Sequence, residues 1–171
     1  LESLWLEIKF KKISYIIGGV FRHPDRNILQ FSDGFDKFLT KLTKRKIKCF
    51  VCGDYNIDLL KINQNHQIDE YFNLVISNNF YPAIQHPTRV TQSSATLIDN
   101  IFVSDNCKVE DTKYLSGNLL HTISDHLPNF ILCKRISTRV DYDQRPLIRI
   151  FSSKNKNTFL NEEAVLDYLI K

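Results

Sequence analysis

The chain has 171 residues, of which 43% are hydrophobic and 25% charged, and its formal net charge at pH 7 is +4. This length suits one domain, and the composition excludes an intrinsically disordered chain. No apolar run approaches the roughly 20 residues that cross a bilayer, and the N-terminus lacks a secretory signal pattern. We therefore expect an intracellular protein without a membrane partner. The positive charge is compatible with a polyanionic partner but does not require one.

Two neighbouring strands are predicted at the N-terminal end. Apolar residues alternate over residues 4–10 and run almost unbroken over residues 13–21, and Lys11-Lys12 between them suits a tight turn. The segment Arg22-His23-Pro24-Asp25 then ends the extended pattern, because proline cannot donate to a sheet ladder.

A helix, a buried strand and a second helix are predicted next. From Phe31 to Leu42, apolar residues recur at helical spacing with lysines between them, which predicts an amphipathic helix with a basic face. The apolar run at 47–52 predicts a buried strand that delivers Asp54 to the loop at its carboxyl end. Residues 68–77 predict a second helix that stops at Asn78-Asn79.

The rest of the chain predicts a loop, three strands and a tail. Residues 80–94 contain prolines and polar residues, which are typical of an irregular loop with room for one short strand. Strands are predicted at 97–103, 108–115 and 129–133. Residues 1–135 are thus expected to form one domain, and residues 136–171 a basic linker with a short helix over 161–170. The chain contains no methionine and begins abruptly, which suggests a fragment.

Cys49 and Cys52 have the spacing of a zinc half-site or a redox pair. They lie within an apolar run, and no second such pair or closely spaced histidine pair follows. We therefore expect buried strand cysteines in a reducing compartment.

Three short strings carry acid, amide and imidazole groups at predicted strand ends. Hydrolysis of a phosphodiester needs a cation to offset developing charge, an oriented water and an acid for the leaving oxygen. Asp54 and Asn56 can place an acceptor and a donor toward one point, and Asp125 can ligate a hard divalent ion. Asp99 can hold the His126 imidazole through its second ring nitrogen. Together these groups indicate metal-assisted phosphodiester hydrolysis.

Each group also has a structural interpretation. Singly, an Asp-x-Asn pattern after a strand is more often a side-chain-capped turn, and a histidine such as His126 is more often an ordinary half-buried residue. Asp99 is harder to explain in this way, because an acid within a buried strand is costly unless it is paired. The other histidines have no adjacent acid in a recognised pattern and are expected to be structural: His23, His66, His86 and His121.

In combination, the motifs resemble those of a known superfamily. Gly53-Asp54-Tyr55-Asn56, Thr96-Leu97-Ile98-Asp99-Asn100-Ile101 and Ser124-Asp125-His126-Leu127-Pro128 are similar to the motifs of the endonuclease/exonuclease/phosphatase superfamily of DNase-I-like folds. The stretches 16–24 and 86–99 further resemble the endonuclease domain of jockey-type non-LTR (LINE-like) retrotransposon proteins. The resemblance covers about residues 1–135.

The resemblance implies an α/β fold, a four-layer sandwich of two packed, mostly antiparallel sheets flanked by helices, here incomplete at the N-terminus. The roles it implies are water activation by Asp54, phosphate contact by Asn56, orientation of the histidine by Asp99, metal binding by Asp125, and contact with the scissile phosphate by His126. Arg89 and Thr96 are expected to touch the DNA backbone.

Two departures from the family pattern predict impaired activity. The family's active-site tyrosine is replaced by Phe21, which keeps the ring but loses the phenolic hydrogen bond. The family's earlier strand asparagine and metal-binding glutamate are expected upstream of Leu1.

The function expected from the resemblance is an Mg2+-dependent (or Mn2+-dependent) DNA endonuclease that nicks double-stranded target DNA to prime reverse transcription. Its further partner would be element RNA, bound through a missing polymerase region, and it would act in the nucleus. The sequence sets no oligomeric state. Two alternatives remain open. One is another superfamily phosphodiesterase, such as an abasic-site endonuclease, and the other is an inactive relic that binds nucleic acid through the basic helix face from Lys37 to Lys48.

Overall fold

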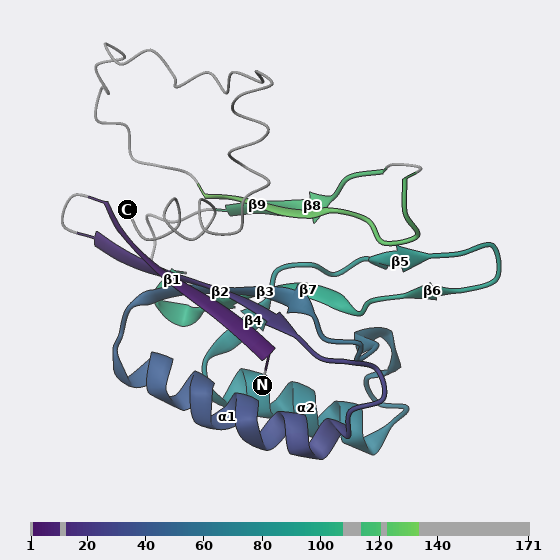
Figure 1. Ribbon diagram of the computed structural model, residues 1–171, viewed down its shortest axis with the longest axis horizontal. Coiled ribbons are helices and arrows are strands. Elements are labelled where there is room, and N and C mark those ends of the chain that lie inside the picture. Colours follow the sequence, from purple (N-terminus) through teal and green to yellow (C-terminus); the bar gives the residue numbers. More distant parts are fainter. Residues whose placement is uncertain (1, 11–12, 108–113, 121–122, 134–171) are drawn as a thin grey trace, which may run out of the picture. The chain divides into compact units, whose positions relative to one another are not determined.

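The computed structural model describes residues 2–10, 13–107, 114–120 and 123–133 (Figure 1). The predicted turn at Lys11-Lys12, the first part of the predicted strand 108–115 and the predicted tail 136–171 lie outside these residues.

A five-stranded sheet forms the centre of the described fold. Its strand order is β1-β2-β3-β7-β4, and only the β2–β3 pair is parallel. The parallel pair brings the carboxyl ends of β2 and β3 to the same edge of the sheet. The strands are β1 (Glu2–Phe10), β2 (Ile13–Phe21), β3 (Lys48–Asp54), β7 (Asp99–Ser104) and β4 (Phe80–Pro82).

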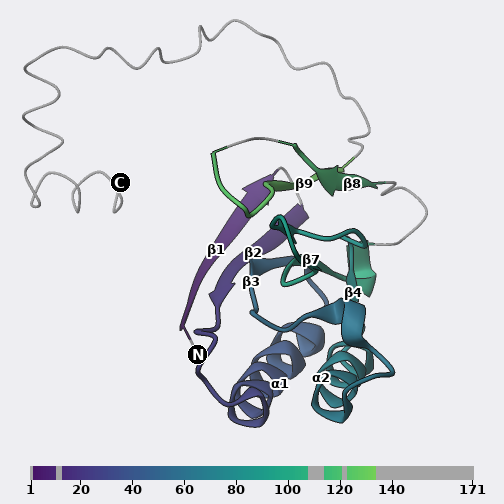
Figure 2. The same cartoon turned by 90° about the vertical axis from the view of Figure 1, so that its right-hand side faces the viewer.

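Two helices pack on one face of this sheet, where both views place them side by side (Figures 1 and 2). They are α1 (Ile28–Lys44) and α2 (His66–Ser77). Both begin two or three residues earlier than the apolar pattern predicts. The reason is that Asn27 and Asn65 cap them, each accepting hydrogen bonds from two backbone N–H groups of the first turn.

Two small antiparallel sheets and two short 3-10 turns complete the described residues. The small sheets are β5 (Arg89–Val90) with β6 (Ala95–Thr96), and β8 (Tyr114–Asn118) with β9 (Asn129–Cys133); the 3-10 turns are Leu59–Lys61 and Asp105–Cys107. The β8–β9 sheet lies on the face of the central sheet opposite the helices (Figures 1 and 2). Its Ile131 packs against the core, and its Ser116 hydroxyl donates to the Ala83 carbonyl.

The α/β fold class is confirmed, with sheets that are mostly antiparallel. One helix layer, the central sheet and β8–β9 account for three of the four predicted layers within the described part of the chain. The predicted loop 80–94 contains β4 and β5, one strand more than its sequence indicated. Within the described ranges, no helix is long and apolar enough to cross a membrane.

An aromatic core joins the helices to the central sheet. The Phe35 ring of α1 lies 5.8 Å from Tyr55 and 6.4 Å from Phe102, measured between ring centroids. Tyr71 of α2 packs on the same three rings. Leu39, one turn after Phe35 in α1, is also fully buried. Burial of this set drives the helices onto the sheet.

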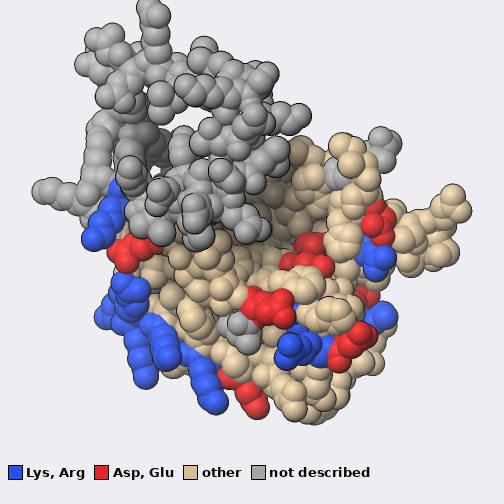
Figure 3. Space-filling model, viewed as in Figure 1, with Lys and Arg blue, Asp and Glu red and all other residues tan. Residues whose placement is uncertain are grey.

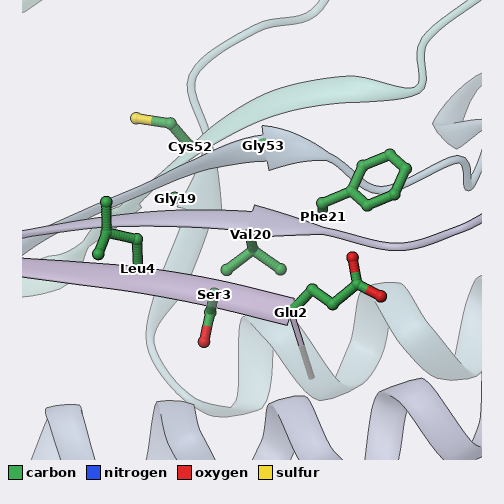
Figure 4. A pocket seen from close by; sticks show the side chains of 8 residues that line it. All are labelled: Glu2, Ser3, Leu4, Gly19, Val20, Phe21, Cys52 and Gly53. Carbon is green, nitrogen blue, oxygen red and sulfur yellow. The ribbon is translucent and has the colours of Figure 1, made fainter. Parts of the chain in front are cut away.

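The face of β1 and β2 that points away from the helices is apolar and exposed, and we call it the open face. Leu4, Leu6 and Ile8 of β1 are 70%, 55% and 45% exposed, and Phe21 of β2 is 41% exposed. A shallow depression of about 440 Å³ opens here, lined by residues of β1, β2 and β3 (Figure 4). Apolar patches of this kind mark surfaces that pack against another element or partner.

A pair of leucines tests this division between the two faces. Leu39→Ala in α1 removes a fully buried side chain, so it is expected to lower the free energy of unfolding by about 2–5 kcal/mol. Leu6→Ala, on the open face, is expected to cost less than about 1 kcal/mol. Urea unfolding of the two variants checks this. Equal costs would show that the open face is covered in solution.

Candidate nuclease site

Two carboxylates lie opposite each other at one edge of the central sheet. Asp54 is the last residue of β3 and Asp99 the first residue of β7, and the antiparallel register pairs them directly. On the other side of β3, Phe21 ends β2 and is the register partner of Asp54. Since directly paired residues project to the same face of a sheet, the three side chains form one row. Asp99 therefore begins its strand, whereas the sequence placed it inside.

His126 joins this row from a different part of the chain. Its Nδ1 lies 3.1 Å from Oδ2 and 3.3 Å from Oδ1 of Asp99, which is the contact expected from the sequence. Asp54, Asp99 and His126 each offer a ligand atom, and these atoms lie within 4.8 Å of one another. The structure thus brings together three of the five residues to which the sequence assigned chemistry.

The turn after β3 fixes how Asp54 is presented. Asp54 Oδ1 accepts a hydrogen bond of 3.0 Å from the Asn56 backbone N–H, so the side-chain-capped turn is present as well. Asn56 has φ 48°, a left-handed conformation that asparagine tolerates better than most residues. Gly53 is required by close packing, because a Cβ there would overlap the Val20 carbonyl oxygen of β2.

The loop that carries His126 is held by Thr88 and by Val90 of β5. The Ser124 hydroxyl accepts from the His126 backbone N–H at 3.1 Å. The Val90 N–H donates to the Asp125 carbonyl at 2.8 Å, and the Leu127 N–H donates to the Thr88 carbonyl at 2.7 Å. The loop therefore adds to the edge of the β5–β6 sheet, which carries His126 to Asp99.

Thr88 is a site residue that the sequence reasoning did not single out. It is fully buried, and its hydroxyl oxygen accepts from the backbone N–H groups of Ile98 and Asp99 at 3.1 and 3.0 Å. Burial raises the pKa of the Asp99 carboxyl, whereas the Thr88 hydroxyl and His126 oppose that rise and Asp54 adds to it. In the sequence, the only sign of Thr88 is its position in the His86-Pro87-Thr88-Arg89 stretch.

Asp125 and Arg89 pair with each other beside the cluster. The Arg89 Nε donates to Asp125 Oδ2 at 2.7 Å, and both side chains are more than two-fifths exposed. This hydrogen bond lowers the pKa of Asp125 and raises the pKa of Arg89. Thr96 is the β-sheet partner of Arg89, and its carbonyl accepts from the Thr88 N–H. The predicted metal ligand and both predicted DNA contacts therefore adjoin the cluster.

The remaining sequence predictions have simple outcomes. All four cysteines are free thiols, and Cys49 is buried while Cys52 is half-buried, as expected for strand cysteines. Burial raises the pKa of the Cys49 thiol to about 12.

Lysines and arginines gather over α1 (Figure 3), and the exposed ones are Lys37, Lys41, Lys44, Arg45 and Lys46. Arg45 of this set pairs with Glu7 at 3.3 Å.

Comparison with known protein families and with curated proteins gives no match. Solved structures do match. The endonuclease domain of TRAS1, a telomere-specific non-LTR retrotransposon, superposes with a TM-score of 0.62 at 12% identity, covering 79% of this chain and 64% of that domain. The chain has the endonuclease/exonuclease/phosphatase fold.

Two bacterial structures agree. An endonuclease/exonuclease/phosphatase family protein from Leptotrichia buccalis gives a TM-score of 0.57 at 13% identity, over 78% of this chain and 54% of that one. The 3'-5' exonuclease NExo from Neisseria meningitidis gives 0.56 at 14% identity, over 77% and 65%. The chain thus spans less than two thirds of the length of each of these structures.

The raised pKa of Asp99 predicts a pH-dependent stability. Because the folded-state pKa lies above the unfolded value, the native state holds a proton that the unfolded state has already lost, and this contribution to stability disappears as pH rises through the folded pKa. Asp99→Asn removes the effect. Relative to wild type, the variant is expected to gain free energy of unfolding between about pH 3 and about pH 7. Urea unfolding of both proteins at the two pH values tests this, and a difference that stays constant or shrinks would contradict it.

Proposed function

We propose that the chain is the catalytic part of a metal-dependent DNA endonuclease of a non-LTR retrotransposon. The observation that supports this most is the cluster of Asp54, Asp99 and His126 at one sheet edge, in a fold shared with the TRAS1 endonuclease domain. Paired carboxylates with an oriented imidazole suit phosphodiester hydrolysis. The activity of a whole domain is part of this proposal, since the chain spans only 64% of the TRAS1 domain.

The proposed roles follow from the contacts each side chain already makes. Asp54 accepts the proton of the attacking water as the water oxygen bonds to phosphorus; the bond from phosphorus to the 3' oxygen breaks, and that oxygen takes up a proton from solvent to leave as the 3' hydroxyl. Asp99 occupies Nδ1 of His126, which leaves Nε2 for an oxygen of the scissile phosphate. The Asn56 amide donates one N–H to the Arg22 carbonyl at 2.8 Å and keeps its second N–H for a phosphate oxygen.

The donor set fits a hard divalent cation such as Mg2+ or Mn2+, because Asp54 and Asp99 offer carboxylate oxygens within 4.8 Å of each other and of His126. When bound, such a cation offsets the negative charge that develops on the phosphate. Asp125 can add a further carboxylate once it releases Arg89. An exposed ion pair of this kind contributes little to stability, so it opens at little cost.

Double-stranded DNA is the proposed substrate. Release of Arg89 from Asp125 gives the guanidinium a phosphate partner on the DNA backbone, with Thr96 beside it on β6. We further propose that the nick primes reverse transcription in the nucleus, with element RNA bound by a polymerase region. Phe21 lacks a phenolic hydroxyl, so the hydrogen bond that a tyrosine would supply there is lost, and we expect this to weaken the activity.

A plasmid-nicking assay in Mg2+ tests the proposed function. It compares this chain with a form extended to the full length of the TRAS1 domain, of which the chain spans 64%. The extended form is expected to nick supercoiled plasmid, and Asp54→Asn or His126→Ala is expected to slow it by about 10²–10⁴-fold, because each removes a proton-transfer or phosphate-binding group.

Matched controls are Asp33→Asn and His66→Ala, which change the same residue types at exposed positions of α1 and α2. Both are expected to nick like wild type. Nicking that persists in the Asp54 and His126 variants would contradict the mechanism. Robust nicking by the chain alone would show that the part of the TRAS1 domain that this chain does not span is not needed for activity.

A further inference from the structure

Arg22 is a buried arginine that binds the backbone of the site turn. It follows β2 directly and is only 4% exposed. Its Nε donates to the Tyr55 carbonyl at 2.7 Å, and its Nη2 donates to the Asn56 carbonyl at 2.7 Å. Its Nη1 donates to the carbonyls of Pro24, at 3.4 Å, and of Arg26. One guanidinium therefore ties the turn after β2 to the turn after β3.

The backbone of Arg22 adds two further bonds to the same turn. Its N–H donates to the Asp54 carbonyl at 3.0 Å, and its carbonyl accepts from the Asn56 side-chain amide at 2.8 Å. All three residues of the turn, Asp54, Tyr55 and Asn56, are thus bonded to Arg22. Sequence reasoning does not reveal these bonds, because the three residues of the turn lie 32 to 34 positions from Arg22.

Burial of this charge is costly unless its donors are satisfied. Among the described residues, no carboxylate forms an ion pair with Arg22, so backbone carbonyls are its partners. Burial lowers the pKa of the guanidinium, which Tyr71 and Asp54 oppose. A guanidinium offers five N–H groups in a planar fork, which suits several carbonyls at fixed angles, whereas a lysine ammonium is a point charge without that geometry.

We propose that Arg22 is a positioning residue, which acts through Asp54 and Asn56 by holding the turn 54–56 in the shape that presents both side chains to the phosphate. This rests on the proposed function in so far as those two residues act on phosphate. The left-handed conformation of Asn56 makes such a clamp useful, because that backbone shape is held only where its surroundings fix it.

Hydrogen exchange measured by NMR on the chain itself tests the clamp. The reporters are the backbone amides of Asn56, bonded to Asp54, and Tyr55, bonded to the Ile98 carbonyl at 2.9 Å. In Arg22→Gln and Arg22→Lys, both amides are expected to exchange about tenfold faster or more, whereas the amides within β3 keep their protection. Arg26→Gln is the matched control, because the Arg26 side chain is exposed in the same turn. This variant is expected to leave the exchange of both amides unchanged.

Each outcome decides the clamp. Unchanged exchange at Asn56 in Arg22→Gln would overturn it. If the Tyr55 and Asn56 amides of Arg22→Lys exchange as in wild type, a positive charge is enough to hold the turn and the planar guanidinium is not needed. Equal acceleration throughout β3 in Arg22→Lys, or its failure to fold, would show that Arg22 serves the whole fold instead of the turn.

Mn2+ affinity separates this proposal from the proposed function. Free Mn2+ is measured by electron paramagnetic resonance during titration of wild type, Asp54→Asn and Arg22→Lys. Both variants are expected to bind Mn2+ about tenfold more weakly, because residues that orient ligands affect metal affinity to this extent. If Asp54→Asn binds like wild type, the metal site of the proposed function fails. If only Arg22→Lys binds like wild type, Arg22 does not position Asp54.

Discussion

Asp54 and Asp99 face each other across the antiparallel pair β3–β7, and a slip of one residue in that pairing would send one carboxylate to the other face of the sheet. The register is fixed by buried neighbours along both strands. Val51 pairs with Phe102, and both are fully buried. Close packing of β2 against Gly53 fixes the position of β2, the strand that contributes Phe21 to the row. The packing of the core therefore decides where the two carboxylates lie.

This arrangement carries an electrostatic cost that the surroundings partly offset. Like charges directly opposite each other in a sheet are destabilising, and Asp54 accordingly adds to the raised pKa of Asp99. The imidazole of His126 and the hydroxyl of Thr88 act in the opposite direction. A divalent cation held by the two carboxylates would lessen this repulsion. The strain of the site is thus of the kind that divalent-metal binding relieves.

Most of the fold was predictable because burial has a period that the sequence displays. The strands 13–21 and 129–133 have the bounds that their apolar runs predict. The helices were found by their spacing, but their first turns were missed because capping by Asn27 and Asn65 is a local bond rather than a periodic signal. The two-residue strand β5 is too short to show any period.

The site was predictable only in part, for a related reason. The cost of an unpaired acid near a buried strand correctly indicated that Asp99 has a partner, and His126 is that partner. Arg22 and Thr88 were not predicted as site residues. Each acts through hydrogen bonds to backbone groups distant in sequence, Arg22 to the Tyr55 carbonyl and Thr88 to the Asp99 N–H. A residue type alone does not reveal such partners. The roles assigned to Asp125 and Arg89 stay predictions, because in the structure these two side chains bind each other.

The most direct measurement of the central claim is an NMR titration of the five histidine side chains with Mn2+, which broadens the signals of nearby nuclei. The cluster predicts that the His126 imidazole signals broaden first, and that Asp54→Asn shifts this broadening to higher Mn2+. Broadening that begins at His66, which lies beside Glu70 on α2, or that affects all five histidines equally, would contradict a metal site at Asp54, Asp99 and His126.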